Sequence, residues 1–330
     1  MLRRRDVIRG LGGTILTSVQ PTGTRAQDSG PVKLIGVLLN SSSTDPQTQL
    51  DVAAFRKAME RLGWSVHYNI AIAYRFGSGV GQNDESLRKN ARDLVASKPD
   101  VIVVTGSALL AASEATHTIP IIFLLRSEPV VSGFAQSLAR PGGNVTGFAE
   151  NPIEMGSKWV ELIRELDPKA SRIALLFDTL DLYLPSVKTA ASSLGLSAQG
   201  LHLQSSDEIN SSIASFARDG NGALVISPEA FAVANRERII ASAAAYRVPA
   251  IYPFPLFSKS GGLLCYGIAR EEQFQQAAGY VDRVLRGAKP SELPIQQPTK
   301  YSLIINLKTA KALGLTIPPT LLARADEVIE

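Results

Sequence analysis

The sequence of 330 residues has little of what a disulfide scaffold, a metal site or a membrane span requires. Its single cysteine, Cys265, cannot form an internal disulfide. Its three histidines, His67, His117 and His202, follow strand or helix patterns and lack the spacing of metal ligands. No stretch approaches the roughly 20 consecutive apolar residues of a membrane-spanning helix. We therefore expect no disulfide, no metal and no cofactor, and Cys265, inside an apolar strand pattern, is interpreted as inert packing.

Motifs of the common enzyme classes are also missing. The sequence contains no G-x-S-x-G, no P-loop and no G-x-G-x-x-G. We therefore expect no catalytic residue. A two-lobed enzyme of the sugar-nucleotide transferase type is the alternative from another class, and it would need a nucleotide-phosphate site that the sequence does not show.

Positive charge is concentrated at the start of the chain. Residues 1–26 hold five arginines against one aspartate, which accounts for the whole net charge of +4 and leaves the remainder neutral. Without an excess of positive charge, the remainder of the chain lacks the basic surface that binds the phosphates of nucleic acid. We therefore expect no nucleic-acid partner. Arg4-Arg5-Asp6-Val7-Ile8 resembles a twin-arginine signal, and Thr24-Arg25-Ala26 resembles a cleavage site.

Residues 1–26 are therefore predicted to be an export signal, the alternative being a disordered basic tail. No cysteine lies near the cleavage point, which excludes a lipid anchor there. The predicted protein is periplasmic and not anchored, and the choice between twin-arginine and general export stays open.

Short apolar runs alternate with helical patterns along most of the chain. A length of 330 residues favours two domains, and strands alternating with helices favour right-handed βαβ units on parallel sheets. The expected strands are 32–39, 66–74, 101–104 and 119–125, then 173–177, 198–203, 223–226 and 250–252. A helix is expected over 229–246. Three strand patterns of the first set recur in the same order in the second, which indicates two similar lobes.

Three segments are predicted to connect the lobes. The first follows Gly147, where dense turn residues lead to a helix start at Asn151-Pro152. The second is an apolar strand ending at Gly267, and the third is the proline-rich stretch 288–299. We predict an α/β fold of two doubly wound parallel-sheet lobes with three hinge crossings. The first lobe comprises 32–147 with 267–297, and the second comprises 148–266 with 298–330.

Two long motifs carry a resemblance to a known family. One is Ser137-Leu138-Ala139-Arg140-Pro141-Gly142-Gly143-Asn144-Val145-Thr146-Gly147. The other begins at Gly287-Ala288-Lys289-Pro290 and continues through Ile305-Asn306-Leu307-Lys308-Thr309-Ala310-Lys311-Ala312-Leu313-Gly314 to Pro318-Pro319. Together they closely resemble ABC-transporter substrate-binding proteins, some of which are associated with aromatic amino acids. The similarity covers essentially residues 30–330.

The resemblance implies a type I periplasmic binding protein fold with the ligand in the cleft between the lobes. One segment departs from the family, because Ser127-Glu128-Pro129-Val130 stands where Gly-Asp-Pro-Val is common. Arg126 precedes it. Since this loop is expected to face the cleft, the family's ligand is not transferred to this chain.

Ligands of doubly wound sheets lie beyond the carboxyl ends of the strands. That rule selects sixteen candidate binding residues: Asn40, Ser41, Ser42, Thr105, Gly106, Ser107, Leu125, Arg126, Ser127, Asp178, Ser227, Pro228, Glu229, Tyr252, Phe254 and Tyr266.

Each group of candidates has a plainer alternative. Thr105 to Ser107 offer free amides to a carboxylate, or simply cap a helix. Arg126 offers a bidentate contact to a carboxylate, or pairs with Glu128 or solvent. Asp178 receives an ammonium, or caps a turn. The three aromatic residues stack on a ligand ring, or fill the core.

We therefore expect a non-enzymatic receptor of an ABC importer. It would close its lobes on an amino acid, aromatic favoured, or a related carboxylate, and act as a monomer with an inner-membrane permease and its ATPase. The alternative is the ligand-binding subunit of a sensor system.

Overall fold

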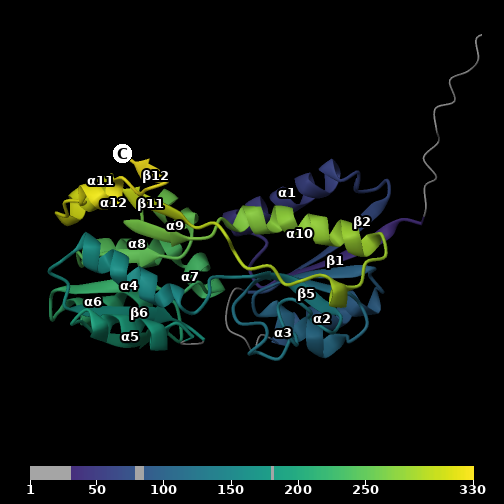
Figure 1. Cartoon of the computed structure of the whole chain (residues 1–330), viewed down its shortest axis with the longest axis horizontal. Helices are drawn as coiled ribbons and strands as arrows, with labels where there is room; N and C mark the ends of the chain where they lie inside the picture. Colours follow the sequence, from purple (N-terminus) through teal and green to yellow (C-terminus); the bar gives the residue numbers. More distant parts are fainter. Residues whose placement is uncertain (1–30, 79–84, 180–181) are drawn as a thin grey trace, which may run out of the picture.

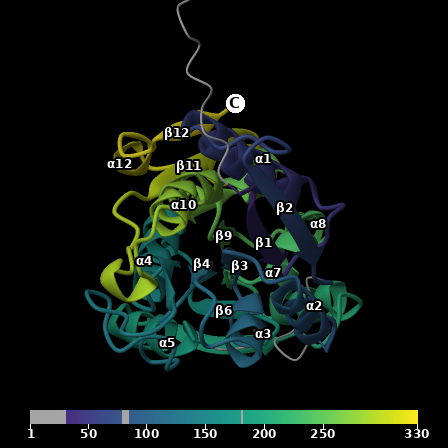
Figure 2. The same cartoon turned by 90° about the vertical axis from the view of Figure 1, so that its right-hand side faces the viewer.

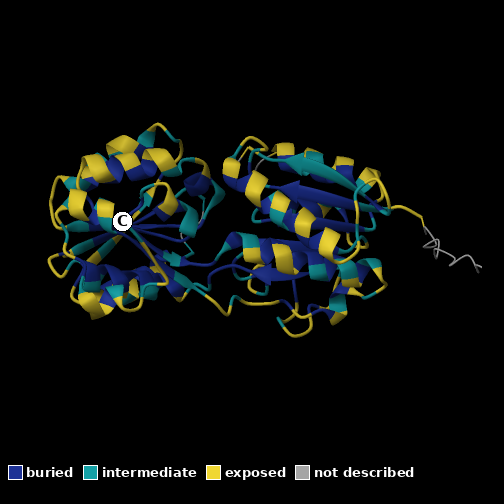
Figure 3. Ribbon diagram, turned by 90° about the horizontal axis from the view of Figure 1, so that it is seen from above, coloured by how far each residue is buried: buried dark blue, intermediate teal, exposed yellow. Residues whose placement is uncertain are grey.

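The computed structural model describes residues 31–78, 85–179 and 182–330, so the predicted export segment 1–26 lies outside the described residues. The described chain forms two α/β lobes side by side (Figure 1), with buried strands between exposed helix surfaces (Figure 3). In the described part of the chain, no helix is long and apolar enough to cross a membrane.

The first lobe is a five-stranded parallel sheet in the order β2-β1-β3-β4-β5. Its strands are β1 (Lys33–Leu39), β2 (Ile70–Phe76), β3 (Val101–Thr105), β4 (Ile121–Arg126) and β5 (Val145–Ala149). Helices α1 (Pro46–Arg61) and α10 (Arg270–Leu285) share an apolar cluster with one face, and α2 (Glu85–Ala96) and α3 (Ala108–Ala115) with the other.

The alternation of side chains along β1 shows why helices cover both faces of this sheet. Val37 and Leu39 pack in the cluster of α1 and α10, whereas Leu38 packs with α2 and α3. Because all three are buried, β1 reads as a continuous apolar run, as expected of a parallel strand. The Asp45 carboxylate begins α1 by accepting a hydrogen bond from the Thr48 amide at 3.0 Å.

The second lobe is a seven-stranded sheet in the order β12-β11-β10-β9-β8-β6-β7. Its strands are β6 (Arg172–Phe177), β7 (Ser197–His202), β8 (Gly222–Ile226), β9 (Ala250–Tyr252), β10 (Leu264–Gly267), β11 (Ser302–Asn306) and β12 (Glu327–Ile329). Its helices are α4 (Met155–Leu166), α5 (Leu184–Ser193), α6 (Glu208–Ala217), α7 (Ala230–Ala234), α8 (Arg236–Ala245), α9 (Pro255–Lys259), α11 (Leu307–Leu313) and α12 (Pro319–Leu322). Figure 2 gives an end-on view.

The predicted α/β class with two lobes is confirmed, and the strand order supports the internal repeat. The order β2-β1-β3-β4 of the first sheet matches β7-β6-β8-β9 of the second. The second sheet is not wholly parallel, because β10 and β11 pair antiparallel. Strand β12, absent from the prediction, has an exposed face and little apolar pattern. The helix expected over 229–246 is divided at Asn235 into α7 and α8.

Three connections join the lobes, over residues 150–154, 268–269 and 297–301. Strand β5 continues to Ala149 and Phe148 bridges to Gln296, so the first lobe extends two residues beyond Gly147. Helix α10 returns to the first lobe and packs against α1 (Figure 1). One buried apolar cluster continues from these two helices through Phe254 and Ile268 to α6, α7 and α8, which packs the lobes against each other beside the connections.

Candidate functional site

A cavity of about 100 Å³ lies between the lobes, at the carboxyl ends of strands from both sheets. This is the position that the strand-end rule predicts. Ten of the sixteen predicted residues line it: Asn40, Gly106, Ser107, Leu125, Arg126, Ser127, Asp178, Ser227, Pro228 and Glu229.

The ends of β1 and β3 are tied together on the first lobe's side of the cavity. The Thr105 hydroxyl donates to the Asn40 side-chain oxygen at 2.9 Å and accepts from the Asn40 amide at 3.1 Å. Gly106 has a φ of +50°, and a β-carbon there would lie 2.6 Å from Asn40 Nδ2. The glycine therefore lets the backbone turn into the cavity beside Asn40. Ser107 precedes α3 without a side-chain cap bond.

A distorted end of β4 carries Arg126 to the cavity. The pairing of β4 with β5 is irregular between Phe123 and Arg126, and Leu125 has a φ of +54°. Such backbone is strained for a leucine and is concentrated at functional sites in proteins. The Arg126 Nε is buried without a hydrogen-bond partner among the described residues, and burial lowers the pKa of the guanidinium. The guanidinium also lies over the Phe134 ring, 5.4 Å from its centre.

Ser127 joins the two lobes at the edge of the cavity. Its hydroxyl lies 2.9 Å from the Tyr183 hydroxyl, which donates to the Asn151 carbonyl at 2.8 Å. Tyr183 belongs to the second lobe and also packs against Trp159, with ring centres 5.1 Å apart. Ser127 therefore supplies a buried contact between the lobes.

The second lobe contributes carboxylates. Asp178 follows β6, and its Oδ1 is buried without a hydrogen-bond partner in the described structure. The Glu229 carboxylate accepts hydrogen bonds from the amides of Asp178 at 2.8 Å and Thr179 at 3.2 Å. Glu229 thereby links the ends of β6 and β8.

Seven lining residues were not predicted: Glu150, Thr179, Leu182, Tyr183, Ala230, Phe231 and Arg270. The strand-end rule finds Glu150 once β5 is recognised as a strand. Arg270 is the first residue of α10 and lies more than 100 residues after β4 in the sequence. No local sequence pattern predicts that it lies beside β4 in the fold.

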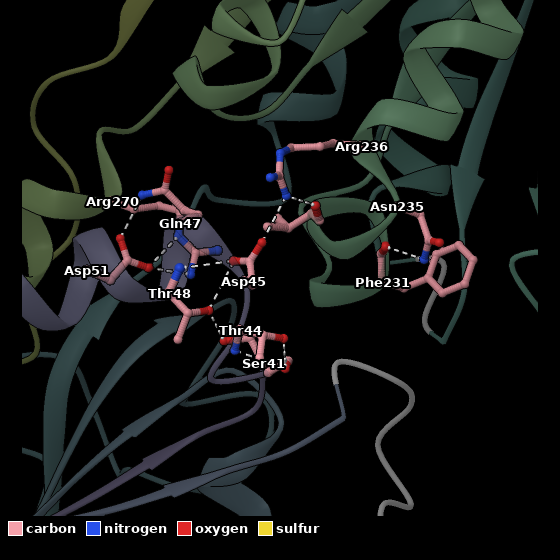
Figure 4. Close-up of polar contacts among 12 residues, drawn as sticks. Ser41, Thr44, Asp45, Gln47, Thr48, Asp51, Phe231, Asn235, Arg236 and Arg270 are labelled. Carbon is pink, nitrogen blue, oxygen red and sulfur yellow. Dashed lines mark hydrogen bonds and ion pairs between the residues drawn. The ribbon is translucent and has the colours of Figure 1, made fainter.

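Glu150 and Arg270 lie in two buried charged groups. Burial raises the pKa of Glu150 to about 8, against the opposing effect of Arg270, Ser127 and Arg126. The Arg270 guanidinium donates from Nε and Nη2 to Asp51 Oδ2, at 3.1 and 2.7 Å (Figure 4). Burial also raises the pKa of Asp51, although Arg270 and a hydrogen bond from Gln47 act against it.

Six predicted residues do not line the cavity, each because of its own local contacts. Ser41 is buried with its hydroxyl 2.7 Å from that of Thr48, and Ser42 bonds to Thr44. Thr105 is buried behind Asn40.

The three predicted aromatic residues are used in packing. Tyr252 stacks on Phe257 with ring centres 5.0 Å apart, and Phe254 is buried beneath Arg270. Tyr266 stacks on Tyr301 beside the second and third connections. The alternative that these aromatics fill the core is the one that the structure supports.

The fold defines a two-lobed α/β protein with a cavity between its lobes. The sequence matches the ABC transporter substrate binding protein family over residues 36–329, and the chain belongs to this family. It is therefore a substrate-binding protein and not an enzyme.

Known proteins resemble this chain in sequence and in fold. A tyrosine-binding protein of Clostridioides difficile (strain R20291) is 28% identical over 320 residues, covering 92% of this chain and 90% of the relative. The structure of an ABC domain in complex with L-Trp from Streptococcus pneumonia has a TM-score of 0.82 at 24% identity, covering 90% of this chain and all of that one. The ligand-free, open structure of a substrate-binding protein with adhesive properties from Clostridium difficile has a TM-score of 0.66 at 24% identity, covering 90% and 99%.

Proposed function

We propose that this protein is an extracytoplasmic receptor of an ABC importer that closes its lobes on an amino acid, with aromatic side chains favoured. One observation carries the proposal. Two residues that line the same cavity each have a buried polar atom without a hydrogen-bond partner in the described structure: Arg126 Nε in the first lobe and Asp178 Oδ1 in the second. A buried charged group without a partner is costly, and a ligand that supplies the partner removes the cost. An α-carboxylate suits the guanidinium, and an α-ammonium suits the carboxylate.

The other residues that line the cavity favour a ligand with an apolar side chain. Leu125, Leu182, Tyr183 and Phe231 line the same cavity as the charged groups. Such a mixture of a few polar groups with apolar and aromatic walls is typical of small-molecule sites. The name of the tyrosine-binding relative supports the choice of an amino acid with an aromatic side chain.

The first test is a thermal-shift screen of the purified protein with the twenty L-amino acids at neutral pH, followed by calorimetry of those that stabilise it. Arg126→Gln and Asp178→Asn are each expected to weaken binding about 10- to 100-fold, since a hydrogen bond to a charged group contributes about 1.5–3 kcal/mol. Arg140→Gln and Asp219→Asn replace exposed residues outside the cavity and serve as matched controls. Stabilisation by none of the amino acids would overturn the proposed ligand class.

The second test separates import from sensing. Reconstituted with its permease and ATPase in lipid vesicles, the ligand-loaded receptor should stimulate ATP hydrolysis and uptake of labelled ligand. A receptor that binds the amino acid but stimulates neither would favour a sensor subunit.

A further inference from the structure

Glu150 is an acidic side chain buried at the cavity, at the first residue of the connection that follows β5. It is 7% exposed, lines the cavity and begins the first connection after β5. Its backbone amide donates to the Arg126 carbonyl at 3.1 Å, so the ends of β4 and β5 hold it beside the arginine. The hydroxyl oxygen of Ser127 lies 3.4 Å from its carboxyl oxygen Oε2.

Two arginines line the same cavity, yet the described structure contains no ion pair within 4.0 Å between Glu150 and either of them. Arg270 is held by the buried Asp51 carboxylate. Arg126 has a buried Nε without a partner. Glu150 and Arg126 are thus near enough to influence each other electrostatically, and neither neutralises the other by contact.

The groups around Glu150 come from both lobes. The cations are Arg126 of β4 and Arg270 of α10, and the hydroxyls are those of Ser127 and Tyr183. The acidic residues in this region are Glu128, Glu229, Asp178 and Asp51. The two cations favour ionisation of Glu150, while burial opposes it.

The protonation state of Glu150 decides what Arg126 can bind. With the carboxyl protonated, Arg126 is the uncompensated cation on the first lobe's side of the cavity, and an incoming carboxylate meets no nearby competitor. With the carboxyl ionised, a second negative charge in the same low-dielectric space repels that carboxylate. Burial, which raises the pKa of Glu150 to about 8, leaves the group mostly protonated at neutral pH.

We infer that Glu150 is a specificity-determining residue, whose protonated form admits a ligand carboxylate beside Arg126 and whose ionised form excludes it. This inference rests on the proposed binding of an amino acid in this cavity. It makes ligand binding proton-linked and sets the selectivity for anionic groups by a residue that belongs to the connection between the lobes.

The first experiment measures binding of an equimolar mixture of the twenty L-amino acids, by native mass spectrometry and thermal shift, at pH 7 and pH 9. If only the protonated form binds, affinity should fall about tenfold between these values. Glu150→Gln keeps the shape and cannot ionise, so its binding should lose the extra pH dependence that the native protein shows between pH 7 and pH 9. Glu128→Gln, which replaces a carboxyl group outside the cavity, should keep it. Equal pH dependence in the native protein and Glu150→Gln would overturn the inference.

The second experiment needs no ligand and separates this inference from the proposed function. In protein labelled with ¹³C at glutamate Cδ, the signal that disappears in Glu150→Gln is followed by NMR from pH 4 to pH 10. We expect it to titrate near pH 8, and at a higher pH in Arg126→Gln because a nearby cation is removed. Titration near pH 4.5 with the other glutamates would overturn the inference even if an amino acid binds. Titration near pH 8 with no amino acid bound would support the protonated cavity and refute only the proposed ligand.

Discussion

At the scale of single residues, the buried carboxyl of Glu150 should reduce stability at neutral pH. The native state holds its proton up to about pH 8, whereas the unfolded chain releases it near 4.5. Between these values the unfolded state binds fewer protons, so this residue's contribution to the free energy of unfolding falls as pH rises. Relative to the native protein, Glu150→Gln should gain stability from pH 5 to pH 8 by an amount of the order of a few kcal/mol, constant above pH 8.

Urea unfolding of both proteins at pH 5, 6.5, 8 and 9 measures this difference. Glu128→Gln is the control for the loss of one carboxyl group on the neighbouring loop. A difference between Glu150→Gln and the native protein that does not change with pH would show that the carboxyl ionises equally in both states.

At the scale of elements, α10 is held to α1 by the Asp51–Arg270 pair. The Asp51 side chain is 1% exposed and that of Arg270 is 9% exposed. Removing one partner leaves a buried charge without compensation, so Arg270→Met should lower the free energy of unfolding by about 3–5 kcal/mol. Arg283→Met, at an exposed position of the same helix, should change it by less than about 0.5 kcal/mol.

Chemical denaturation of both variants and of the double variant Asp51→Leu/Arg270→Met measures this coupling. The double variant should recover most of the stability, because it removes both charges together. A double variant as unstable as Arg270→Met would mean that the arginine acts through its packing over Phe254 and not through the pair.

At the scale of the whole molecule, an ion pair between described residues crosses from one lobe to the other away from the connections. Arg236 of α8 donates to Asp45 at the start of α1 at 2.9 Å, and their side chains are 13% and 11% exposed (Figure 4). Contacts present only when the lobes are together favour that arrangement. Arg236→Ala should therefore shift the ligand-free protein toward separated lobes and weaken ligand binding by up to about tenfold.

Small-angle X-ray scattering and calorimetry test this shift. Arg238→Ala removes a neighbouring arginine of α8 whose partner, Asp207, is 92% exposed and lies in the same lobe. This control should change neither the radius of gyration nor the affinity. An unchanged radius in Arg236→Ala would show that the ion pair does not hold the lobes together.

The sequence by itself determined most of the strands and helices, the two-lobed class and ten of the seventeen residues that line the cavity. Each depends on short-range patterns: apolar runs such as β1, caps such as Asn306 before α11, and polar residues directly after a strand, as at Arg126 and Asp178. These patterns act between near neighbours, so the linear order of residues is sufficient to read them.

Tertiary structure alone decided which side chains share the cavity. Arg270 reaches it because α10 returns to the first lobe, and Tyr183 because its hydroxyl contacts that of Ser127, directly after the end of β4. Tyr252 and Phe254 are equally close to a strand end but are buried in the core. Tyr252 stacks on Phe257, and Phe254 lies beneath Arg270. The reason is physical: burial and charge at a position depend on groups distant in sequence, and only the packed lobes bring those groups together.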